Sequence, residues 1–257
     1  MSDDRLKTPH AAQRADALQV SVVMPCLNEA ETVGICVAKA VETLTRLKVA
    51  GEVVVADNGS TDGSQEIARR AGARVVNAPR RGYGSALMSG FEEARAPFII
   101  FADSDDSYDL RELGPFIDRL SAGADLVIGT RRKGTIKPGA MPALNRFGNF
   151  FFAMLVRVLF GPGISDVHSG MRGFTRDALQ RMSLGAPGME FASEMAVKAK
   201  LAGLRIEEVP ITHSPAGRSR APHLRPFRDG WRHLKLILDL AVHRKTLVRE
   251  SGENHRS

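Results

Sequence analysis

Residues 97–109, "PFIIFADSDDSYD", join a run of apolar residues to a cluster of aspartates. The apolar run predicts a β-strand that is buried on both faces, because a half-exposed strand would alternate apolar and polar residues. Directly after it, four of seven residues are acidic: Asp103, Asp105, Asp106 and Asp109. Carboxylates this close together repel one another, so they contribute nothing to folding by themselves. A positively charged partner is therefore expected at the end of this strand.

Short apolar runs alternate with segments of helical periodicity on both sides of this stretch. We predict strands over residues 20–25, 52–57, 73–79, 97–103, 124–130 and 205–212. We predict helices over residues 28–47, 65–72, 84–94 and 188–203. Asn28 and Glu31, three residues apart, suit the capping of the first of these helices. The alternation predicts an α/β, Rossmann-like fold in which helices flank a mostly parallel central sheet.

The length and composition fit one large domain. The chain has 257 residues, of which 43% are hydrophobic, enough to bury a full core. Residues 1–19 are polar, lack the apolar stretch of a signal peptide, and are expected to form a disordered tail. Two cysteines, Cys26 and Cys36, do not suggest a disulfide framework, so a reducing compartment is expected.

No segment is expected to cross a membrane, because a span needs roughly 18–20 apolar residues. The nearest approach, within residues 147–160, is interrupted by Arg157. The same segment is open to two interpretations: a core helix that covers the sheet, or an interfacial helix that meets a membrane. A polar loop is expected before it, over residues 131–144. We therefore expect a cytoplasmic protein that can lie on the cytoplasmic face of a membrane.

The C-terminal segment, residues 218–257, is basic. Between Arg218 and Arg249 there are nine Lys or Arg residues and two Asp residues. This excess suggests a phosphate-bearing partner, although a solvated basic tail has the same composition. Apolar residues recur at helical spacing, which fits a helix lying on an anionic surface or one packed on the domain: Phe227, Trp231, Leu234, Leu238 and Val242.

A nucleic-acid-binding protein is a remote alternative. It explains the net charge of +7 but leaves the aspartate cluster without a purpose. Only two tyrosines and one tryptophan are present for base stacking. We therefore expect no nucleic-acid partner.

Three polar clusters follow predicted strands: residues 25–31, 57–64 and 103–109. Ligands of open parallel sheets bind at the carboxyl ends of the strands, so the three clusters predict one site. The first cluster, "PCLNEAE", lacks the Gly-x-Gly-x-x-Gly fingerprint of dinucleotide-binding proteins. Asp103 and Asp105 suit a hard cation, Mg²⁺ or Mn²⁺, held together with substrate phosphates. Such a cation neutralises a diphosphate as it leaves.

Four segments together resemble the signature blocks of family 2 glycosyltransferases: "VVMPCLNEAETV", "EVVVADNGSTDGS", "RRGYGSALMSGFEEA" and "FADSDDSYD". "SDVHSGMRGF" and "GMEFASEMAVKA" are similar to the branch that contains polyprenyl-phosphate (dolichol-phosphate) sugar synthases. The resemblance runs from about residue 20 to residue 240. It implies a GT-A catalytic domain over residues 20–217, with the basic segment 218–257 part of this domain or packed on it.

The resemblance also implies roles for individual residues. The nucleotide sugar is expected to contact Pro25, Leu27, Glu29, Val55, Asp57, Asp103, Ser104, Asp105, Arg131 and Arg220. Asp103, Ser104 and Asp105 correspond to the Asp-x-Asp element of the family, with Asp105 the expected direct metal ligand. Ser107 stands where relatives often have glutamine or serine, and would act on the metal through water. Arg131 would approach the diphosphate.

The late loop departs from the family pattern. Relatives commonly carry an arginine and a lysine around a "GxSK" stretch, whereas this chain reads "SPAGRSRAPHLR", with Ser214 near the expected arginine. Arg218 and Arg220 can supply equivalent charge, and arginine suits a bidentate grip on phosphate. Alternatively, Arg218 and Arg220 are surface residues of the basic tail.

The acceptor is the least defined part of the prediction. Asp166 and Glu194 are candidates for acting on it, with Asp166 favoured, and Glu194 is alternatively a buried structural acid. A hydroxyl acceptor needs a general base, whereas a phosphate acceptor is already ionised. The sequence thus predicts a metal-dependent, inverting transfer of a sugar from a nucleoside-diphosphate sugar to a polyprenyl phosphate. Arg131, Arg218 and Asp166 are the expected catalytic residues. A saccharide hydroxyl is the alternative acceptor, and a separate membrane-anchoring partner is possible.

Overall fold

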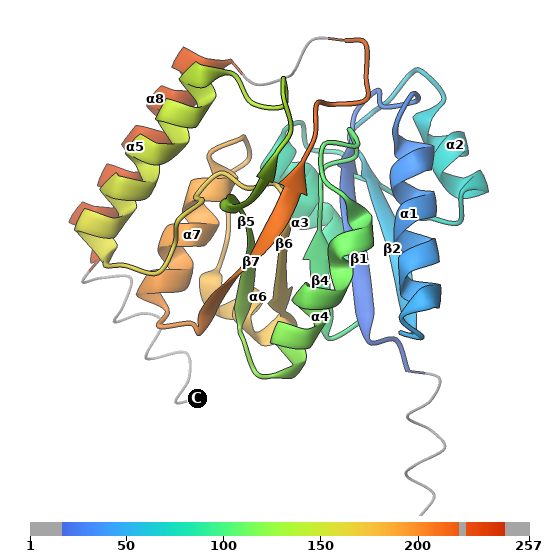
Figure 1. Ribbon diagram of the computed structural model, residues 1–257, viewed down its shortest axis with the longest axis horizontal. Helices are drawn as coiled ribbons and strands as arrows, with labels where there is room; N and C mark the ends of the chain where they lie inside the picture. Colours follow the sequence, from blue (N-terminus) through green and yellow to red (C-terminus); the bar gives the residue numbers. More distant parts are fainter. Residues whose placement is uncertain (1–16, 221–224, 245–257) are drawn as a thin grey trace, which may run out of the picture.

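The computed structural model describes residues 17–220 and 225–244. Its centre is a seven-stranded sheet in the order β3-β2-β1-β4-β6-β5-β7 (Figure 1). The strands are β1 (Val20–Cys26), β2 (Gly51–Asp57), β3 (Arg74–Asn77), β4 (Phe98–Phe101), β5 (Leu126–Ile136), β6 (Arg172–Thr175) and β7 (Ile206–His213). The expected tail, residues 1–19, lies mostly outside the described residues.

The sheet is mostly parallel, as predicted. β1 pairs in parallel with β2 and β4, and β5 pairs in parallel with β7. β6 is antiparallel to both of its neighbours, β4 and β5. The sequence did not predict β6, because its four residues, "RGFT", show neither an apolar run nor an alternation.

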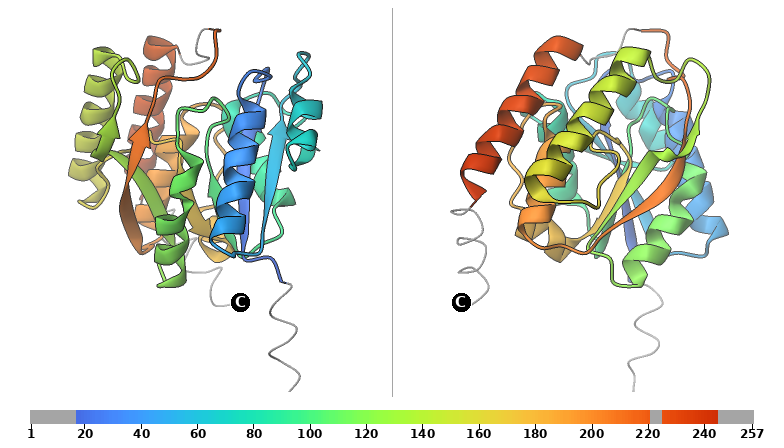
Figure 2. Two further views of the ribbon diagram at one scale, coloured as in Figure 1. Left: turned by 45° about the vertical axis from the view of Figure 1, so that its right-hand side comes forward. Right: turned by 60° about the vertical axis from the view of Figure 1, so that its left-hand side comes forward.

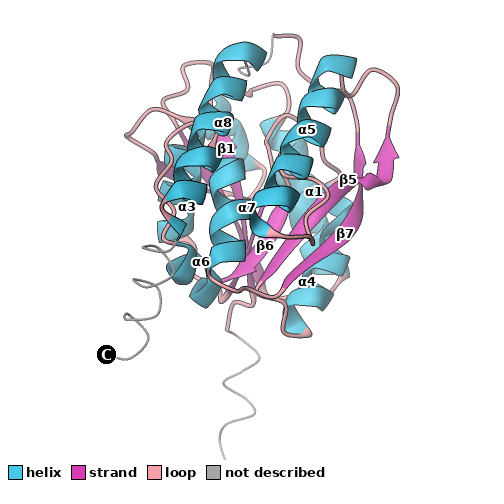
Figure 3. Ribbon diagram, turned by 90° about the vertical axis from the view of Figure 1, so that its left-hand side faces the viewer, coloured by secondary structure: helices cyan, strands magenta, loops and turns pink. Residues whose placement is uncertain are grey.

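Helices cover both faces of the sheet (Figure 3). One face packs against α3 (Tyr83–Glu93), α5 (Ala143–Phe160), α6 (Arg176–Met182), α7 (Phe191–Leu201) and α8 (Pro226–Val242). The other packs against α1 (Val33–Arg46), α2 (Ser64–Arg70), the 3₁₀ turn η1 (Leu110–Glu112) and α4 (Leu113–Ser121). Each face buries a continuous apolar cluster, which explains why the central strands read as uninterrupted apolar runs.

The first helix begins later than predicted, and the proposed capping pair was wrong. α1 starts at Val33, and its N-cap residue, Thr32, makes no capping hydrogen bond with its side chain. Asn28 adopts a left-handed conformation, with φ of 58°, and its side chain accepts a hydrogen bond from the N–H of Thr61. The residues before α1 therefore form a loop at the sheet edge rather than a helical turn.

The loop predicted over residues 131–144 was also wrong in its first half. β5 continues to Ile136, and after an irregularity its last residues pair with Thr212 and His213 of β7. Arg132, Lys133 and Thr135 of this extension are polar and exposed. The extension carries Arg131 to the carboxyl end of the sheet.

α5 and α8 lie side by side along the edge of one helical layer (Figure 2). By length and composition alone α5 qualifies as a membrane span, so the expectation that no segment is long enough was too strict. In the structure one side of it, including Phe152, Ala153 and Val156, is buried in the core. α8 buries Ile237 and Leu240 in the same core, so the described part of the basic segment packs on the domain.

Candidate active site

The carboxyl ends of β1, β2 and β4, together with the beginnings of α3 and α8, line a cavity of about 440 Å³. We call it the carboxylate cavity. Its wall includes Leu27, Glu29, Asn58, Asp103, Asp105 and Arg218. The three polar clusters predicted from sequence therefore lie at one edge of the sheet, as parallel strands require.

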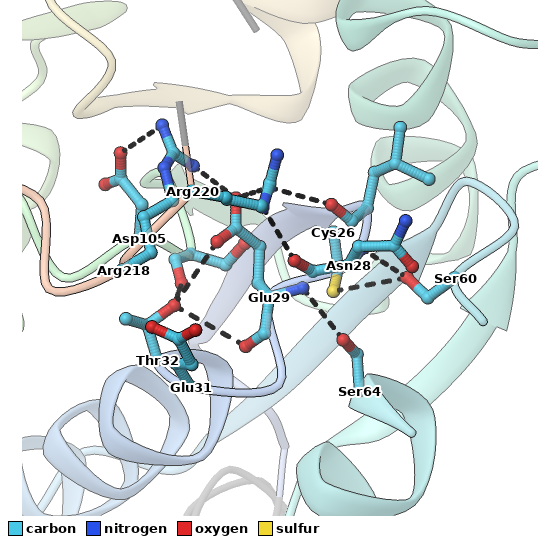
Figure 4. A network of polar contacts seen from close by, with 12 residues as sticks. Cys26, Asn28, Glu29, Glu31, Thr32, Ser60, Ser64, Asp105, Arg218 and Arg220 are labelled. Carbon is cyan, nitrogen blue, oxygen red and sulfur yellow. Dashed lines mark hydrogen bonds and ion pairs between the residues drawn. The ribbon is translucent and has the colours of Figure 1, made fainter. Parts of the chain in front are cut away.

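The positive partner expected for the aspartate cluster comes from the late loop (Figure 4). Arg218 contacts Asp105 at 3.1 Å and also pairs with Glu29. Arg220 pairs with Glu29 and donates to the carbonyl oxygen of Leu27 at 2.8 Å. The sequence left two roles open for Arg218 and Arg220: binding a phosphate, or lying on the surface of the basic tail. In the structure both contact acidic side chains of the site, so neither lies on an open surface.

Asp105 is fully engaged by protein groups in this structure. Its Oδ1 accepts the hydroxyl and the N–H of Ser107, at 2.5 and 3.1 Å, while its Oδ2 faces Arg218. Ser107 therefore orients the carboxylate that was expected to bind the metal. A cation that binds Oδ2 of Asp105 competes with the guanidinium of Arg218 for this oxygen.

The negative charge of Asp103 is poorly compensated by nearby positive groups. Burial, followed by the negative charge of Asp105, raises the pKa of Asp103 to about 7. The hydroxyl of Tyr83 donates to its Oδ1 at 2.8 Å and acts in the opposite direction. Asp103 therefore gains from any further positive charge that approaches it.

These residues suit a divalent cation that is bound partly by protein carboxylates and partly by oxygen atoms of a substrate. Within the described ranges, no cluster of three or more His, Cys, Asp or Glu side chains is arranged to hold a metal ion alone. Two carboxylates, Asp103 and Asp105, face one cavity, and the first lacks compensation. Mg²⁺ commonly binds one or two carboxylates and completes its shell with water and phosphate oxygens. The donor set therefore suits Mg²⁺ or Mn²⁺ in the presence of a diphosphate.

A second cavity, of about 250 Å³, adjoins the first and shares Tyr83, Asp103 and Met189 with it. We call it the histidine cavity. Its wall includes Arg131, Asn149, Phe152, His168, His213 and His233. It lies between the sheet edge and the helices α5 and α8, so any ligand in it sits beside Asp103.

Arg131 is held at this second cavity by Asp166. The two side chains form a bidentate pair, with Nε–Oδ2 at 2.8 Å and a second N–O contact at 2.7 Å. Asn149 donates to the same carboxylate at 3.0 Å. Burial alone would raise the pKa of Asp166, but the hydrogen bonds and charge of Arg131 outweigh it and lower that pKa. Asp166 is therefore an ionised anchor for Arg131, fully buried and outside both cavity walls.

Four of the predicted donor contacts are not in the wall of the carboxylate cavity: Val55, Asp57, Arg131, which lines the histidine cavity, and Arg220. Val55 is fully buried in the apolar core under α1, because its side chain points away from the site. Asp57 accepts hydrogen bonds from the N–H groups of Gly59 and Ser60 and from Gln65, and so stabilises its own loop. By contrast, Pro25, Leu27, Glu29 and Ser104 do line the cavity.

Glu194 is a buried structural acid, which is the second of the two roles that the sequence left open for it. It is buried on α7, accepts hydrogen bonds from the N–H groups of Gly185 and Ala186, and pairs with Lys198 at 2.9 Å. It therefore fixes the loop before α7 and is not in either cavity wall.

Sequence reasoning gave no role to Tyr83 and His213, which are among the side chains that line the histidine cavity. Tyr83 belongs to the quoted block "RRGYGSA", yet nothing in the sequence pairs it with Asp103, twenty residues later. His213 ends β7, and only its place at the carboxyl end of a predicted strand signalled a site residue. Both contacts depend on the sheet order, which the sequence alone did not define.

Gly170 allows Asp103 to occupy its position, which gives a first prediction. A Cβ at this position would lie 2.3 Å from Oδ2 of Asp103 and 3.0 Å from the Tyr108 ring. Gly170→Ala is expected to displace Asp103 and to lower kcat/KM by at least about tenfold, with a loss of stability of about 1–3 kcal/mol. Steady-state kinetics and thermal unfolding measure both effects. Gly185→Ala, which meets no atom within 4 Å, is the control, and equal effects of the two variants would contradict this role of Gly170.

Solved structures share this architecture. A glucosyl-3-phosphoglycerate synthase from Mycobacterium tuberculosis, in complex with Mn²⁺, uridine diphosphate and phosphoglyceric acid, is 23% identical and superposes with a TM-score of 0.64 over 90% of this chain and 80% of that chain. A mannosyl-3-phosphoglycerate synthase from Rubrobacter xylanophilus gives a TM-score of 0.64 at 20% identity, over 92% and 75% of the two chains. At these identities the likeness shows the fold, which is of the GT-A type.

Relatives by sequence are closer. The low-salt glycan biosynthesis hexosyltransferase Agl6 of Haloferax volcanii is 42% identical over 85% of this chain, which spans only 53% of that relative. A dolichyl-phosphate hexose transferase of the same organism is 33% identical, over 82% of this chain and 89% of the relative. Residues 21–183 match glycosyl transferase family 2. The chain therefore belongs to glycosyl transferase family 2 and is a nucleotide-sugar glycosyltransferase.

Proposed function

We propose that the protein transfers a sugar from a nucleoside-diphosphate sugar to a polyprenyl phosphate, with inversion at the anomeric carbon. The observation that carries the proposal is the position of Arg131. Its guanidinium is anchored by a buried carboxylate at the wall of a cavity that adjoins Asp103. An arginine held in this way suits an acceptor that already carries a negative charge.

The donor is assigned to the carboxylate cavity. Leu27 and Glu29 line the part next to β1, and Asp103 and Asp105 lie where the diphosphate is expected. Bound Mg²⁺ or Mn²⁺ would neutralise the negative charge that develops on the departing diphosphate. Arg218, once released from Asp105, would provide a second positive charge to the same oxygens.

The acceptor is assigned to the histidine cavity, where Asp166 is not available as a general base. Asp166 is buried and paired with Arg131, so it has no free oxygen for a proton of the acceptor. A phosphate oxygen is already a nucleophile and needs only to be positioned in line with the leaving group. The name of one relative, dolichyl-phosphate hexose transferase, supports an acceptor of this kind.

A second candidate is transfer to the hydroxyl of a small phosphorylated acceptor. It is favoured by the likeness to the glucosyl-3-phosphoglycerate synthase, whose structure contains phosphoglyceric acid. In this case Arg131 would bind the phosphate of the acceptor while a neighbouring hydroxyl attacks. A mechanism in which Asp166 is the base for that hydroxyl does not fit the ion pair at Arg131.

The surface beside the histidine cavity suits an acceptor with a lipid tail. α5 and α8 expose large apolar side chains: Phe147, Phe150, Phe151, Met154 and Val158 on α5, and Phe227, Trp231, Leu238 and Val242 on α8. Arg146 and Arg157 are exposed on α5. Apolar and basic side chains together fit the surface of an anionic membrane. We therefore place the enzyme at such a surface, with these helices facing the lipid.

The test uses radiolabelled UDP- and GDP-sugars with Mg²⁺ or Mn²⁺. Each donor is incubated with the protein and with a short polyprenyl phosphate, 3-phosphoglycerate or no acceptor, followed by organic extraction. Label that enters the organic phase only with the lipid phosphate supports the proposal and names the sugar and the base. Label that stays aqueous but shifts to a phosphoglycerate product supports the second candidate. Hydrolysis that is indifferent to both acceptors would contradict both.

A further inference from the structure

His213 is fixed between two parts of the proposed site. It is the last residue of β7, next to the extended end of β5. Its ring lies 5.0 Å from the ring of Tyr108, measured between centroids. The N–H of the following residue donates to the carbonyl oxygen of Ser107 at 2.9 Å. The imidazole is thus held between the strand that carries Arg131 and the loop that carries the aspartates.

Tyr108 is itself immobilised, which limits the movement of the histidine ring. It is 3% exposed, and its hydroxyl accepts the N–H of Gly170 at 2.8 Å. A buried ring held at both ends gives His213 a fixed aromatic surface to pack on. The position of the imidazole therefore does not depend on a bound ligand.

One nitrogen of the His213 ring forms no hydrogen bond within the described part of the chain. This nitrogen is Nδ1, which is buried and has no hydrogen-bond partner among the residues that the structure describes. The two other histidines of the cavity wall are linked through one hydroxyl: Ser193 Oγ lies 3.1 Å from Nε2 of His168 and 2.7 Å from Nδ1 of His233. Buried ring nitrogens are normally paired, so an unpaired one on a side chain that lines a cavity calls for a missing partner.

The charges around His213 favour the neutral ring. Burial, followed by the positive charge of Arg131, lowers the pKa of His213, while Asp105, the backbone of Ser107 and Asp166 act in the opposite direction. A neutral imidazole carries one N–H donor and one acceptor nitrogen. Together with the guanidinium of Arg131 it offers hydrogen-bond donors to a single ligand in the histidine cavity.

We propose that His213 is an acceptor-binding residue: its imidazole N–H donates a hydrogen bond to a phosphate oxygen of the lipid phosphate that Arg131 binds. This inference rests on the proposed function and assigns the acceptor a second contact on the sheet. It predicts that His213 affects acceptor binding without affecting the donor, because it lines the histidine cavity and not the carboxylate cavity.

Two substitutions separate the hydrogen bond from the packing. His213→Phe keeps a ring for Tyr108 but removes the N–H, whereas His213→Gln removes the ring but keeps an N–H donor. We expect His213→Phe to raise the KM for a short polyprenyl phosphate about 10- to 100-fold, as expected for a lost hydrogen bond to a charged group. The KM for the nucleotide sugar should not change, and His213→Gln should recover much of the acceptor affinity.

His243→Gln is the control, because this histidine lies in the exposed end of α8, away from both cavities. Titration of Mn²⁺ into each variant, with nucleoside diphosphate present, supplies a readout apart from turnover. An unchanged acceptor KM in His213→Phe would overturn the inference while leaving the proposed function intact. Weaker Mn²⁺ binding or a raised donor KM would also overturn it, since either result places His213 at the metal. A wild-type enzyme that ignores polyprenyl phosphate would overturn both proposals.

Discussion

Asp105→Asn is expected to lower kcat by about 10³-fold or more with every donor and acceptor, which is the largest effect predicted for this enzyme. The substitution keeps the size of the side chain and removes the charge that a cation on the diphosphate requires. Folding should be little affected, because Arg218 keeps its second partner, Glu29. The measurement is the release of nucleoside diphosphate at saturating donor, together with calorimetric titration of Mn²⁺.

Asp106→Asn is the matched control in the same loop. Asp106 pairs with Lys39 at 2.6 Å, does not line the carboxylate cavity, and has a φ of 61°, a conformation that asparagine tolerates. We expect the turnover of this variant to stay close to that of the wild type. If the two variants lost activity equally, the loop as a whole would matter and the role given to the Asp105 charge would be wrong.

Asp166→Asn is expected to destabilise the protein by about 3–5 kcal/mol, because it leaves the buried charge of Arg131 without its counter-ion. The amide would also place an N–H₂ group against donors that now bind a carboxylate oxygen: the Arg131 N–H groups and Asn149. The expected fall in the unfolding midpoint is on the order of 10 °C for a chain of this size. Thermal unfolding followed by circular dichroism measures it.

The control for this effect is Asp177→Asn on α6. Asp177 also pairs with an arginine, Arg181, at 3.6 Å, but its side chain is 64% exposed, so its loss should cost at most about 1 kcal/mol. The kinetics of folded Asp166→Asn then separate two roles. A raised acceptor KM, with turnover within about tenfold of the wild type, fits an anchor for Arg131. A loss of turnover by about 10³-fold, with an unchanged acceptor KM, fits a general base and would contradict our assignment.

The fold was predictable where residues are buried on both faces. The apolar runs of β1, β2 and β4 and the periodic helices between them are sufficient to indicate a parallel α/β sheet. β6 and the end of β5 were missed because their residues are few or exposed and carry no apolar pattern. The sequence could not reveal that β6 runs antiparallel between β4 and β5, since such a pairing is non-local.

The site was predictable as a set of residues but not as a set of contacts. Strand-end clusters placed Glu29, Asp103 and Asp105 together, and the structure brings all three to one cavity. The ion pairs that indicate the roles of these residues join side chains far apart in the sequence: Arg131 with Asp166, and Arg218 with Asp105. Each depends on how a late loop returns to the sheet, which no local signal specifies. Asp166, expected to be catalytic, is for this reason better described as the anchor of Arg131.

The central claim is that the new glycosidic bond forms on an oxygen of the acceptor phosphate that Arg131 binds. Phosphorus-31 NMR of the reaction tests it directly, with a short polyprenyl phosphate, the donor and Mg²⁺. We predict that the acceptor resonance is replaced by that of a phosphodiester, which no longer titrates near the second pKa of a phosphate monoester, about 6. An acceptor resonance that stays unchanged while nucleoside diphosphate accumulates would contradict the claim.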